Sequence, residues 1–573
     1  MAKKYDLFTV PEISSIQDML VRSARVYGNK TALKDLNPTL VPEVSYEGLL
    51  NSVRHFGEGL KSLGIPERTH IALIGENRTQ WGIAYLTAMS YNYVIVPIDR
   101  NLSANEILNI LYESDSEAVI FSEMFYQLFS DKGESIRRLK HFICMDKVQP
   151  GDGFLKMMDL IETGSRASSH TLPAINADDV AEIIFTSGSL GRAKGVMLTQ
   201  KNLTANLMAM TKMINIRSED RFLSVLPIHH TYECTCGFLC PMYCGSTVYY
   251  ARSLKTVVED LQASRATILL AVPLLYDKMF KKIHKGITED KVKSKIVPPL
   301  IKVAGALESV GWKSARKKIF KELHARFGGA VRLFIAGGAA PDPAVAKGLR
   351  EFGFHFVQGY GLTETAPILA LNREDAFKDD AAGLPLPGIQ IKINNPDADG
   401  VGEIYAQGPS VMPGYYKNEA MTKDTFDGPW FKTGDLGYID EDGFLHISGR
   451  KKNVIISKSG KNVFPEEIED ILKRSPFILE SLVYGEEDEK HDEIIAVQIV
   501  PEAEALIELA ESKQTSITPE FINKVIGDVV KEANKELSSY KQIRKFYIRE
   551  KEFEKTTTQK IKRYLVQSTT PAE

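Results

Sequence analysis

The feature that most constrains the fold is a repeated alternation of short apolar runs with longer segments of helical pattern. Runs of about five apolar residues, bounded by turn residues, predict buried strands. Strands that alternate with helices predict a largely parallel sheet with helices on both faces. The predicted strands are 71–75, 93–97, 118–122 and 180–185, and the predicted helices are 79–91 and 104–114.

The length and the charge of the chain limit what it can be. At 573 residues it exceeds one ordinary core, so we expect two to four domains. The formal net charge of −3 implies no general attraction to nucleic acid or to an anionic membrane. No apolar run approaches the roughly 20 residues of a membrane span, and the first residues lack the apolar core of a signal peptide. We therefore expect a cytoplasmic protein with at most peripheral membrane contact.

Two segments allow two interpretations each. Residues 276–327 are helical in pattern and rich in lysine, arginine and apolar residues. We favour a surface helical excursion with solvated cations over a basic amphipathic face that lies on a membrane. Four cysteines, at 234, 236, 240 and 244, follow a histidine pair, but no Cys-x-x-Cys pair is present. The four-residue spacing of Cys236, Cys240 and Cys244 favours one face of a buried helix over a metal site.

A glycine-rich loop follows the predicted strand 180–185. Residues 185–196 read Phe-Thr-Ser-Gly-Ser-Leu-Gly-Arg-Ala-Lys-Gly-Val. Glycines allow backbone amides to converge on an anion, and hydroxyls and cations add donors. The spacing differs from Gly-x-x-x-x-Gly-Lys-Ser/Thr and from Gly-x-Gly-x-x-Gly. The loop predicts phosphate binding by Thr186, Ser187, Gly188, Ser189, Gly191 and Lys194.

Further glycine-containing turns carry the groups that a nucleotide needs. Residues 335–340 form a strand that runs into two glycines, and 357–365 form a second strand and turn. Tyr360 offers a face on which a base can stack, and Glu364 is a ligand for Mg²⁺ that also contacts phosphates. Asp435, between glycines, suits ribose hydroxyls, and Arg450 supplies a fixed cation.

Taken together, these motifs resemble the adenylate-forming (AMP-binding) superfamily, and most of all its long-chain fatty acyl-CoA synthetases. The resemblance implies an α/β fold whose large N-terminal domain, residues 1–450, has parallel-rich sheets and a distorted barrel. It implies a small mobile α+β C-terminal domain, residues 451–573, with a hinge near Lys452. The implied reaction converts a fatty acid and ATP to acyl-AMP and pyrophosphate. CoA then receives the acyl group, which gives acyl-CoA and AMP.

The resemblance also assigns roles to single residues. Lys560, His230 and Glu364 are the implied catalytic residues, and Thr186 with Glu364 holds the Mg²⁺ that accompanies ATP. Tyr360 stacks on adenine. The other ATP-binding residues outside the loop are Gly338, Ala339, Gln358, Gly359, Gly361, Thr363, Asp435 and Arg450. The implied acyl pocket contains His230, Tyr232, Glu233 and Gly337, and the implied CoA channel contains Ser459 and Gly460.

Alternatives remain open at this point. A fatty acyl-AMP ligase that loads a carrier protein shares every nucleotide motif, and so does a medium-chain or aryl acid–CoA ligase. A non-enzymatic relative is disfavoured because Lys194, Glu364, Asp435, Arg450 and Lys560 are all retained. The sequence leaves the acyl-chain length and a homodimer open, and the expected partners are ATP, a fatty acid and CoA, without nucleic acid.

Overall fold

The computed structural model describes residues 5–40, 43–132, 136–147, 153–187, 193–456, 462–487, 493–555 and 561–566. The chain divides into two compact units. The first comprises Met1–Ile391, Ala406–Phe431 and Glu441–Phe444, and the second comprises Lys392–Tyr405, Lys432–Asp440 and Leu445–Glu573. The second unit thus includes two segments that precede residue 450. The predicted hinge near Lys452 stays a prediction.

An eight-stranded sheet contains the strands that the alternation predicts. Its order is β19-β9-β8-β4-β3-β5-β6-β7. From β8 to β7 neighbouring strands are parallel, whereas β9 runs antiparallel to β8 and β19 runs antiparallel to β9. The bounds are β3 His70–Ile74, β4 Val94–Ile98, β5 Ala118–Phe121, β6 His141–Cys144, β7 Leu155–Lys156, β8 Val180–Ser187, β9 Ala193–Thr199 and β19 Gly414–Tyr415. The four predicted strands are confirmed as β3, β4, β5 and β8.

A nine-stranded sheet forms the second large layer. Its order is β16-β15-β14-β13-β12-β10-β11-β1-β2, with parallel pairs from β14 to β1 and antiparallel strands at both ends. The bounds are β1 Thr31–Asp35, β2 Glu43–Ser45, β10 Arg221–Ser224, β11 Thr247–Tyr250, β12 Ile268–Ala271, β13 Leu333–Ala336, β14 His355–Gly361, β15 Ile368–Leu371 and β16 Leu384–Pro385. The predicted α/β class with parallel-rich sheets is confirmed.

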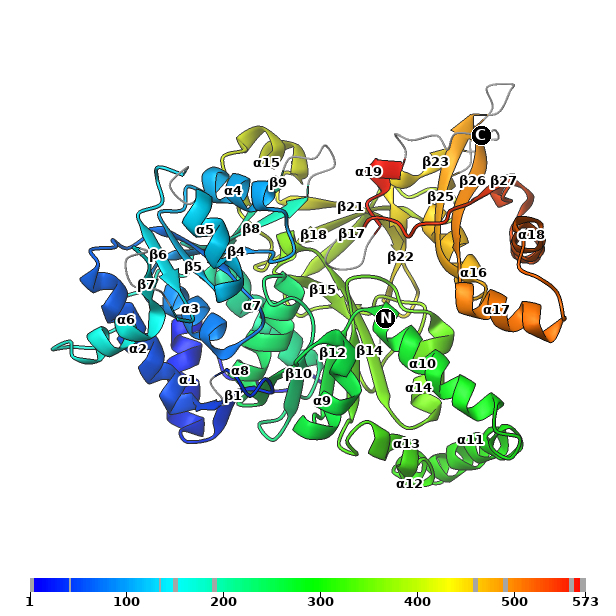
Figure 1. Cartoon of the computed structure of the whole chain (residues 1–573), viewed down its shortest axis with the longest axis horizontal. Coiled ribbons are helices and arrows are strands. Elements are labelled where there is room, and N and C mark those ends of the chain that lie inside the picture. The colour runs from blue at the N-terminus through cyan, green and yellow to red at the C-terminus, as the bar shows by residue number, and fades with distance from the viewer. Residues whose placement is uncertain are drawn as a thin grey trace. The chain divides into compact units, whose positions relative to one another are not determined.

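Alternating side chains on the strands produce a layered first unit (Figure 1). In β3, Ile71 and Leu73 enter the central core, whereas Ala72 and Ile74 enter an outer core. This is the two-residue period of a sheet that is buried on both faces. The central core also contains side chains of the nine-stranded sheet and of α1 Ile16–Tyr27, α2 Tyr46–Ser62, α3 Thr79–Ser90 and α7 Gln200–Met213. Every residue of α3 is buried, as expected for a helix between two layers.

Further helices cover the outer faces. Those of the first unit are α4 Ala104–Glu113, α5 Tyr126–Lys132, α6 Met157–Ser165, α8 Cys240–Cys244, α9 Val257–Ser264, α10 Pro273–Thr288, α11 Lys293–Ser309, α12 Ala315–Ile319, α13 Lys321–Arg326, α14 Pro343–Glu351 and α15 Glu419–Thr425. The predicted helices 79–91 and 104–114 are confirmed as α3 and α4. None of the described helices combines the length and the apolar character needed to span a membrane.

The second unit has a separate core and a mixed α and β composition. A three-stranded sheet, β25-β26-β27, packs with α16 and α18 around this core. The helices are α16 Pro465–Leu472, α17 Ala503–Ser512, α18 Pro519–Glu536 and α19 Arg563–Val566. The remaining strands of the chain are β17 Gln390–Asn394, β18 Gly402–Gln407, β20 Phe426–Asp427, β21 Trp430–Ile439, β22 Leu445–Arg450, β23 Ile455–Ile456, β24 Asn462–Val463, β25 Ile478–Glu487, β26 Glu493–Pro501 and β27 Lys545–Ile548. A smaller second unit of this kind agrees with the predicted fold.

Candidate active site

Lys194, Glu364 and Tyr415 form a closed triangle in the first unit. The Nζ atom of Lys194 lies 2.6 Å from Oε1 of Glu364 and 2.9 Å from Oη of Tyr415. The Tyr415 hydroxyl donates to the same carboxylate oxygen at 2.9 Å. Lys194 comes from β9, Tyr415 from β19 beside it, and Glu364 from the short 3₁₀ helix Thr363–Thr365. The sequence identified the lysine and the glutamate, and the structure brings them together.

The triangle sets the ionisation of its members. Burial alone would raise the pKa of Glu364, but the Lys194 ammonium and the hydrogen bonds outweigh burial and hold that pKa below its usual value. Burial would likewise lower the pKa of Lys194, yet Glu364 and Tyr415 raise it. Burial, reinforced by the Glu364 carboxylate, raises the pKa of Tyr415 to about 12. A buried carboxylate is therefore kept charged beside a half-buried ammonium.

Thr186 lies next to this triangle in the hairpin of β8 and β9. It is the ladder partner of Lys194, and its hydroxyl is buried with no hydrogen-bond partner in the part of the chain that the structure describes. A buried hydroxyl of this kind is an available ligand atom. Ser187 ends β8 opposite Ala193. The predicted residues Gly188, Ser189 and Gly191 lie outside the described residues.

The carboxyl end of β13 opens into the two predicted glycines. Gly338 has a φ of +84°, a left-handed conformation that favours glycine. A Cβ on Gly337 would lie 2.5 Å from the ring of Tyr232, so the ring packs on the bare backbone there. Gly338 and Ala339 are exposed, whereas Gly337 is buried. The exposed backbone of Gly338 and the methyl group of Ala339 are therefore available to contact a flat ligand.

Gln358, at the middle of β14, is buried and already bonded to protein. Its side-chain amide donates to the carbonyl of Ala381 at 2.6 Å and to that of Asp379 at 3.1 Å. These bonds fix the segment that follows β15. Its amide oxygen is buried without a partner in the described residues.

The end of β14 holds the other predicted residues of this turn. Gly361 approaches the Pro367 carbonyl so closely that a Cβ would lie 1.8 Å from that oxygen. A Cβ on Gly359 would lie 3.0 Å from the Leu371 side chain. Tyr360 and Thr363 are half-buried on either side of this turn. The two glycines thus bring β14 and β15 together and present Tyr360 between them.

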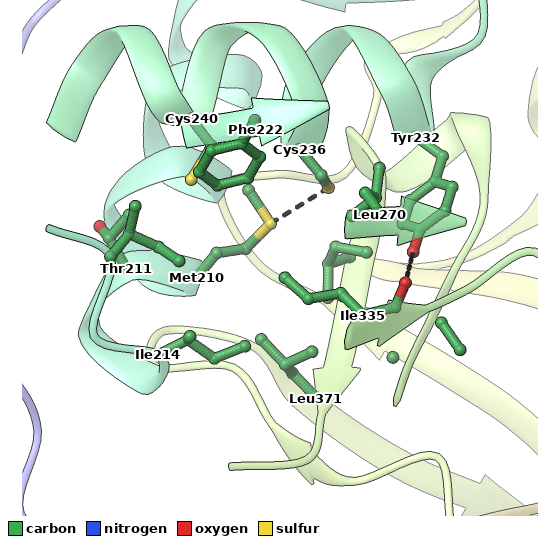
Figure 2. A pocket seen from close by; sticks show the side chains of 14 residues that line it. Met210, Thr211, Ile214, Phe222, Tyr232, Cys236, Cys240, Leu270, Ile335 and Leu371 are labelled. Atoms are coloured by element: carbon green, nitrogen blue, oxygen red, sulfur yellow. Dashed lines mark hydrogen bonds between the residues drawn. The ribbon is translucent and has the colours of Figure 1, made fainter. Parts of the chain in front are cut away.

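An apolar pocket lies behind these strand ends (Figure 2). The pocket, together with the open solvent at its mouth, contains about 450 Å³ of space not filled by protein atoms. Side chains from α7, from the turn of helix at 232–240 and from β12 to β15 line it, and Figure 2 shows Tyr232 at one end, where its hydroxyl donates to the Ile335 carbonyl at 3.4 Å. The lining residues are Met210, Thr211, Ile214, Ile216, Phe222, Tyr232, Cys236, Cys240, Leu270, Ile335, Ala336, Gly359, Ile368 and Leu371.

The cysteine-containing segment is a buried helix, as its spacing predicts. Its first part, Tyr232–Leu239, is a π-helix that continues into α8. The thiols at 234, 236 and 240 are buried in the central core, and Cys236 donates to the Met210 sulfur at 3.5 Å. The π-helical turn was not predicted. π-Helical turns often occur at functional sites.

His230 and Glu233 flank the start of this helix. Burial raises the pKa of Glu233 to about 8, although the nearby Ser224 side chain lowers it. The ring of His230 lies 4.2 Å, centre to centre, from the ring of His229. Ligand atoms of Asp99, His229 and His230 lie within 4.8 Å of one another. Glu233 is thus mainly neutral below pH 8, and His230 borders a polar cluster.

The second unit contains Asp435 and Arg450 as a cross-strand pair. They face each other in the ladder of β21 and β22, with Nε of Arg450 2.9 Å from Oδ1 of Asp435. Asp435 is buried, and its backbone amide donates to the Thr433 hydroxyl at 3.1 Å. Gly434, with a φ of +71°, makes the turn of the backbone that aims this carboxylate. The sequence predicted both residues but not their pairing.

The segment that carries Lys560 lies outside the described residues, but its two ends are described. Lys555 and Ile561 form an antiparallel bridge. Arg563 binds both carboxylate oxygens of Glu469, at 2.7 and 2.6 Å, and donates to the Val483 carbonyl at 2.9 Å. Burial raises the pKa of Glu469 to about 7 although Arg563 lowers it. The bridge joins the two flanks of residues 556–560 to each other, and Arg563 ties the second flank to α16 and β25.

The predicted hinge and CoA channel are only partly described. Lys452 belongs to the 3₁₀ turn Lys451–Asn453 that follows β22 and is exposed. The neighbouring Lys451 pairs with Glu403 at 2.7 Å. Ser459 and Gly460 lie outside the described residues.

Sequence reasoning missed Tyr415 and Arg563. Tyr415 contacts Lys194 across a two-residue strand, and a Gly-Tyr-Tyr run carries no periodic signal that would reveal this pairing. Arg563 lies three residues after Lys560, and the sequence predicted no role for it. Its ion pair with the buried Glu469, 94 positions away in the chain, gives Arg563 a structural role.

Comparison with known families gives a match over most of the chain. Residues 20–416 match the AMP-binding enzyme family, and residues 467–560 match the AMP-binding enzyme C-terminal domain. The two matches include Thr186, Lys194, Glu364 and Tyr415 in the first region and Lys560 in the second.

Curated relatives are similar over nearly the full length. The long-chain-fatty-acid–CoA ligase FadD15 of Mycobacterium bovis is 29% identical, over 98% of this chain and 96% of that protein. The chloroplastic long-chain-fatty-acid–[acyl-carrier-protein] ligase AEE15 of Arabidopsis thaliana is 29% identical, over 84% of this chain and 76% of that protein. Among solved structures, the anthranilate CoA ligase AuaEII in complex with anthranoyl-AMP has a TM-score of 0.77 at 22% identity, with 98% of each chain covered. This last likeness supports the fold.

Proposed function

The chain belongs to the AMP-binding enzyme family, and on that premise we propose that it is an ATP-dependent long-chain fatty acid–CoA ligase. One observation carries this proposal. The apolar pocket includes Ala336, at the end of β13, and Gly359, in β14. Ala336 comes shortly before the predicted nucleotide-binding residues Gly338 and Ala339, and Gly359 is itself one of the predicted nucleotide-binding residues. An apolar chain in the pocket would therefore end beside the ATP-binding turns, where its carboxylate must react.

The first half-reaction joins two anions. A carboxylate oxygen attacks the α-phosphorus of ATP, the bond to the β-phosphate oxygen breaks, and pyrophosphate leaves. Repulsion between the anions must be cancelled by cations and by backbone dipoles in a site that excludes water. We assign the β- and γ-phosphates to Lys194 and to the loop residues Thr186, Ser187, Gly188, Ser189 and Gly191. The half-buried ammonium of Lys194, which stays protonated, supports this role.

The residues near Lys194 also fit the Mg²⁺ ion that accompanies ATP. Glu364 is held ionised, and the Thr186 hydroxyl is buried without a partner among the residues that the structure describes, so both offer hard oxygen ligands. When bound, the ion would neutralise charge on the phosphate oxygens. Lys194 and Tyr415 orient the Glu364 carboxylate before the nucleotide arrives.

The nucleoside would be held by small and aromatic groups. We assign the adenine to the face of Tyr360 and to the backbone of Gly338, Ala339, Gly359 and Gly361, with Gln358 and Thr363 beside it. Asp435, which Arg450 orients, would accept from the ribose hydroxyls.

The second unit would contribute the catalytic lysine, and its movement would separate the two half-reactions. We assign Lys560 to the α-phosphate and carboxylate oxygens in the first step, and Lys452 to a hinge that removes Lys560 before the second. The ion pair of Arg563 with Glu469 supports this role because it fixes the flank of the lysine segment. CoA would enter along Ser459 and Gly460, and its thiol would displace AMP from acyl-AMP.

The acid would be held by its chain and by its polar end. His230 would orient the carboxylate, and Tyr232, Glu233 and Gly337 would shape the mouth of the pocket. Glu233 is mainly neutral near pH 7, so it would not repel the substrate carboxylate. Each methylene group buried in the pocket contributes about 0.8 kcal/mol, which favours long chains.

A second candidate differs only in the acceptor. AEE15 of Arabidopsis, similar over 84% of this chain, is named for loading an acyl carrier protein. The nucleotide and acyl sites would be the same in both cases, so only the thiol of the acceptor separates the two activities.

A pyrophosphate-exchange assay across fatty acids of increasing length tests the proposed function, followed by product analysis with free CoA and with a carrier protein. We expect exchange that rises with chain length and acyl-CoA formation from free CoA. Exchange without acyl-CoA formation would favour the carrier-protein candidate, and no exchange with any fatty acid would contradict both.

A further inference from the structure

Helix α11 has two apolar faces: one packs on the rest of the first unit, and the other is exposed to solvent. On its inner side, Ala304 is buried in a separate core that contains side chains of β12, β13 and β14, and Val297, Leu300 and Ile301 pack against that core. On its outer side and at its two ends, four aliphatic side chains are solvent-exposed. They are Val292 (63% exposed), Ile296 (49%), Val303 (51%) and Val310 (80%). Figure 1 shows α11 at the outer edge of the first unit.

The four exposed side chains lie on one line along the helix. At 3.6 residues per turn, their spacing places them within about 40° of one another around the helix axis. Trp312, which is 44% exposed, follows directly after the helix, and Lys318 lies 5.3 Å from the centre of its ring. The aliphatic stripe from Val292 to Val310, with a tryptophan at its end, covers about five turns of helix. Contiguous exposed apolar patches of this kind mark interaction surfaces.

Positive charge surrounds the stripe. Residues 291–321 contain a single acidic residue, Glu308, which pairs with Arg316 at 2.7 Å. Acidic residues adjoin both ends of the segment: Glu289 and Asp290, which pair with Lys285 and Lys293, precede it, and Glu322 follows it. The exposed lysines of the segment are Lys291, Lys293, Lys295, Lys302, Lys313, Lys317, Lys318 and Lys321. This concentration is local, since the chain as a whole has a net charge of −3.

We propose that this surface, residues 291–321 with its aliphatic stripe and lysines, docks the protein on a lipid bilayer that contains anionic lipids. Aliphatic side chains and a tryptophan suit the boundary between headgroups and acyl chains, and lysines beside them suit anionic headgroups. The charge favours a bilayer over a second copy of this chain, because a symmetric contact would bring the lysines of both copies together. This docking does not depend on which acid the enzyme activates.

The experiment is flotation of the full-length protein with vesicles of phosphatidylcholine, with and without phosphatidylglycerol. We expect binding to the anionic vesicles and weakening in high salt, because salt screens lysine–headgroup attraction. The charge variant is K295Q/K302Q/K313Q, which should reduce the partition coefficient about fivefold per lysine. The stripe variant is V303S/V310S, which should reduce it without changing the charge. The matched controls are K201Q/K423Q and V26S, at exposed positions elsewhere in the first unit.

Circular dichroism melting and pyrophosphate exchange without vesicles show that each variant is folded and active. The proposal is contradicted if wild type binds neutral and anionic vesicles equally, or if the surface variants float like the controls. It is also contradicted if wild type does not float and forms a dimer that V303S/V310S converts to monomer. That result would make a second copy the occupant.

Discussion

The ammonium of Lys194 lies 2.6 Å from the carboxylate of Glu364, although the two residues are 170 positions apart in the chain. The strand β9 supplies the first and a 3₁₀ turn after β14 supplies the second. Tyr415 closes the triangle from β19. The site thus carries a preformed charge pair, which costs no rearrangement of the protein when a triphosphate arrives.

Replacing Lys194 should change how activity depends on pH. In K194M the burial of Glu364 is no longer opposed by the ammonium, so its pKa rises from below its usual value to above it. The acid limb of the pH profile of pyrophosphate exchange should therefore move to higher pH. Activity at neutral pH should fall on the order of a hundredfold, because a phosphate-binding cation is lost. K201M, which removes an exposed lysine of α7, is the control. An acid limb identical to that of wild type would refute the coupling.

Gly337 should be intolerant of even one methyl group. In G337A the new Cβ would lie 2.5 Å from the Tyr232 ring, which must move into the pocket. We expect a loss of about 1–3 kcal/mol in stability and a preference shifted to shorter acids. The double variant G337A/Y232L should recover stability, since it removes the clashing ring. G286A, where nothing lies within 4 Å, should behave like wild type. Unchanged kcat/KM values across chain lengths in G337A would argue against the pocket.

Glu233 should make the protein less stable as the pH rises. Its carboxyl has a folded pKa of about 8 against an ordinary value of 4.5, so the folded state retains a proton that the unfolded state has lost between these values. The free energy of unfolding should fall with rising pH across this window. E233Q does not titrate, so its stability relative to wild type should grow by a few kcal/mol from pH 5 to pH 8. Denaturant unfolding at several pH values measures this. Parallel pH dependences of the two proteins would show that Glu233 ionises normally.

Arg563 should support the segment that carries Lys560. R563M leaves the buried Glu469 carboxyl without its cation, which should destabilise the second unit by about 3 kcal/mol and raise the pKa of Glu469 above 7. R563K keeps the charge but loses the bidentate geometry, so its effect should be smaller. Thermal melting and formation of acyl-AMP measure the two effects. Equal stability of R563M and wild type would exclude a structural role for this pair.

Lys560 should serve only the first half-reaction. K560A should abolish acyl-AMP formation, because no ammonium reaches the α-phosphate and carboxylate oxygens. It should still convert supplied acyl-AMP and CoA to acyl-CoA at close to the wild-type rate. The neighbouring K562A is the control, since it removes a lysine of the same basic segment. Equal loss of both half-reactions in K560A would remove the assigned role.

Local pattern predicted the scaffold well, because β3, α3, β4 and α4 are each specified by nearby residues. Separate motifs likewise predicted phosphate binding by Lys194 and Mg²⁺ binding by Glu364, each without reference to the other. Their pairing, and the presence of Tyr415, depend on contacts between strands distant in sequence, which periodicity does not encode. The π-helical turn at Tyr232–Leu239 was missed because its cysteine spacing resembles that of an α-helix. Residues 392–405 and 432–440 belong to the second unit. This membership also depends on contacts between segments distant in sequence, so local pattern did not predict it.

The most direct test of carboxylate activation by ATP follows an oxygen atom. When a fatty acid labelled with ¹⁸O in both carboxylate oxygens reacts with ATP and CoA, the attacking oxygen becomes the bridge of acyl-AMP. Thiol attack on the carbonyl then leaves that oxygen on AMP. Mass spectrometry should find one ¹⁸O atom in AMP, one in the acyl-CoA and none in pyrophosphate. Label in inorganic phosphate together with formation of ADP, or unlabelled AMP, would contradict the account.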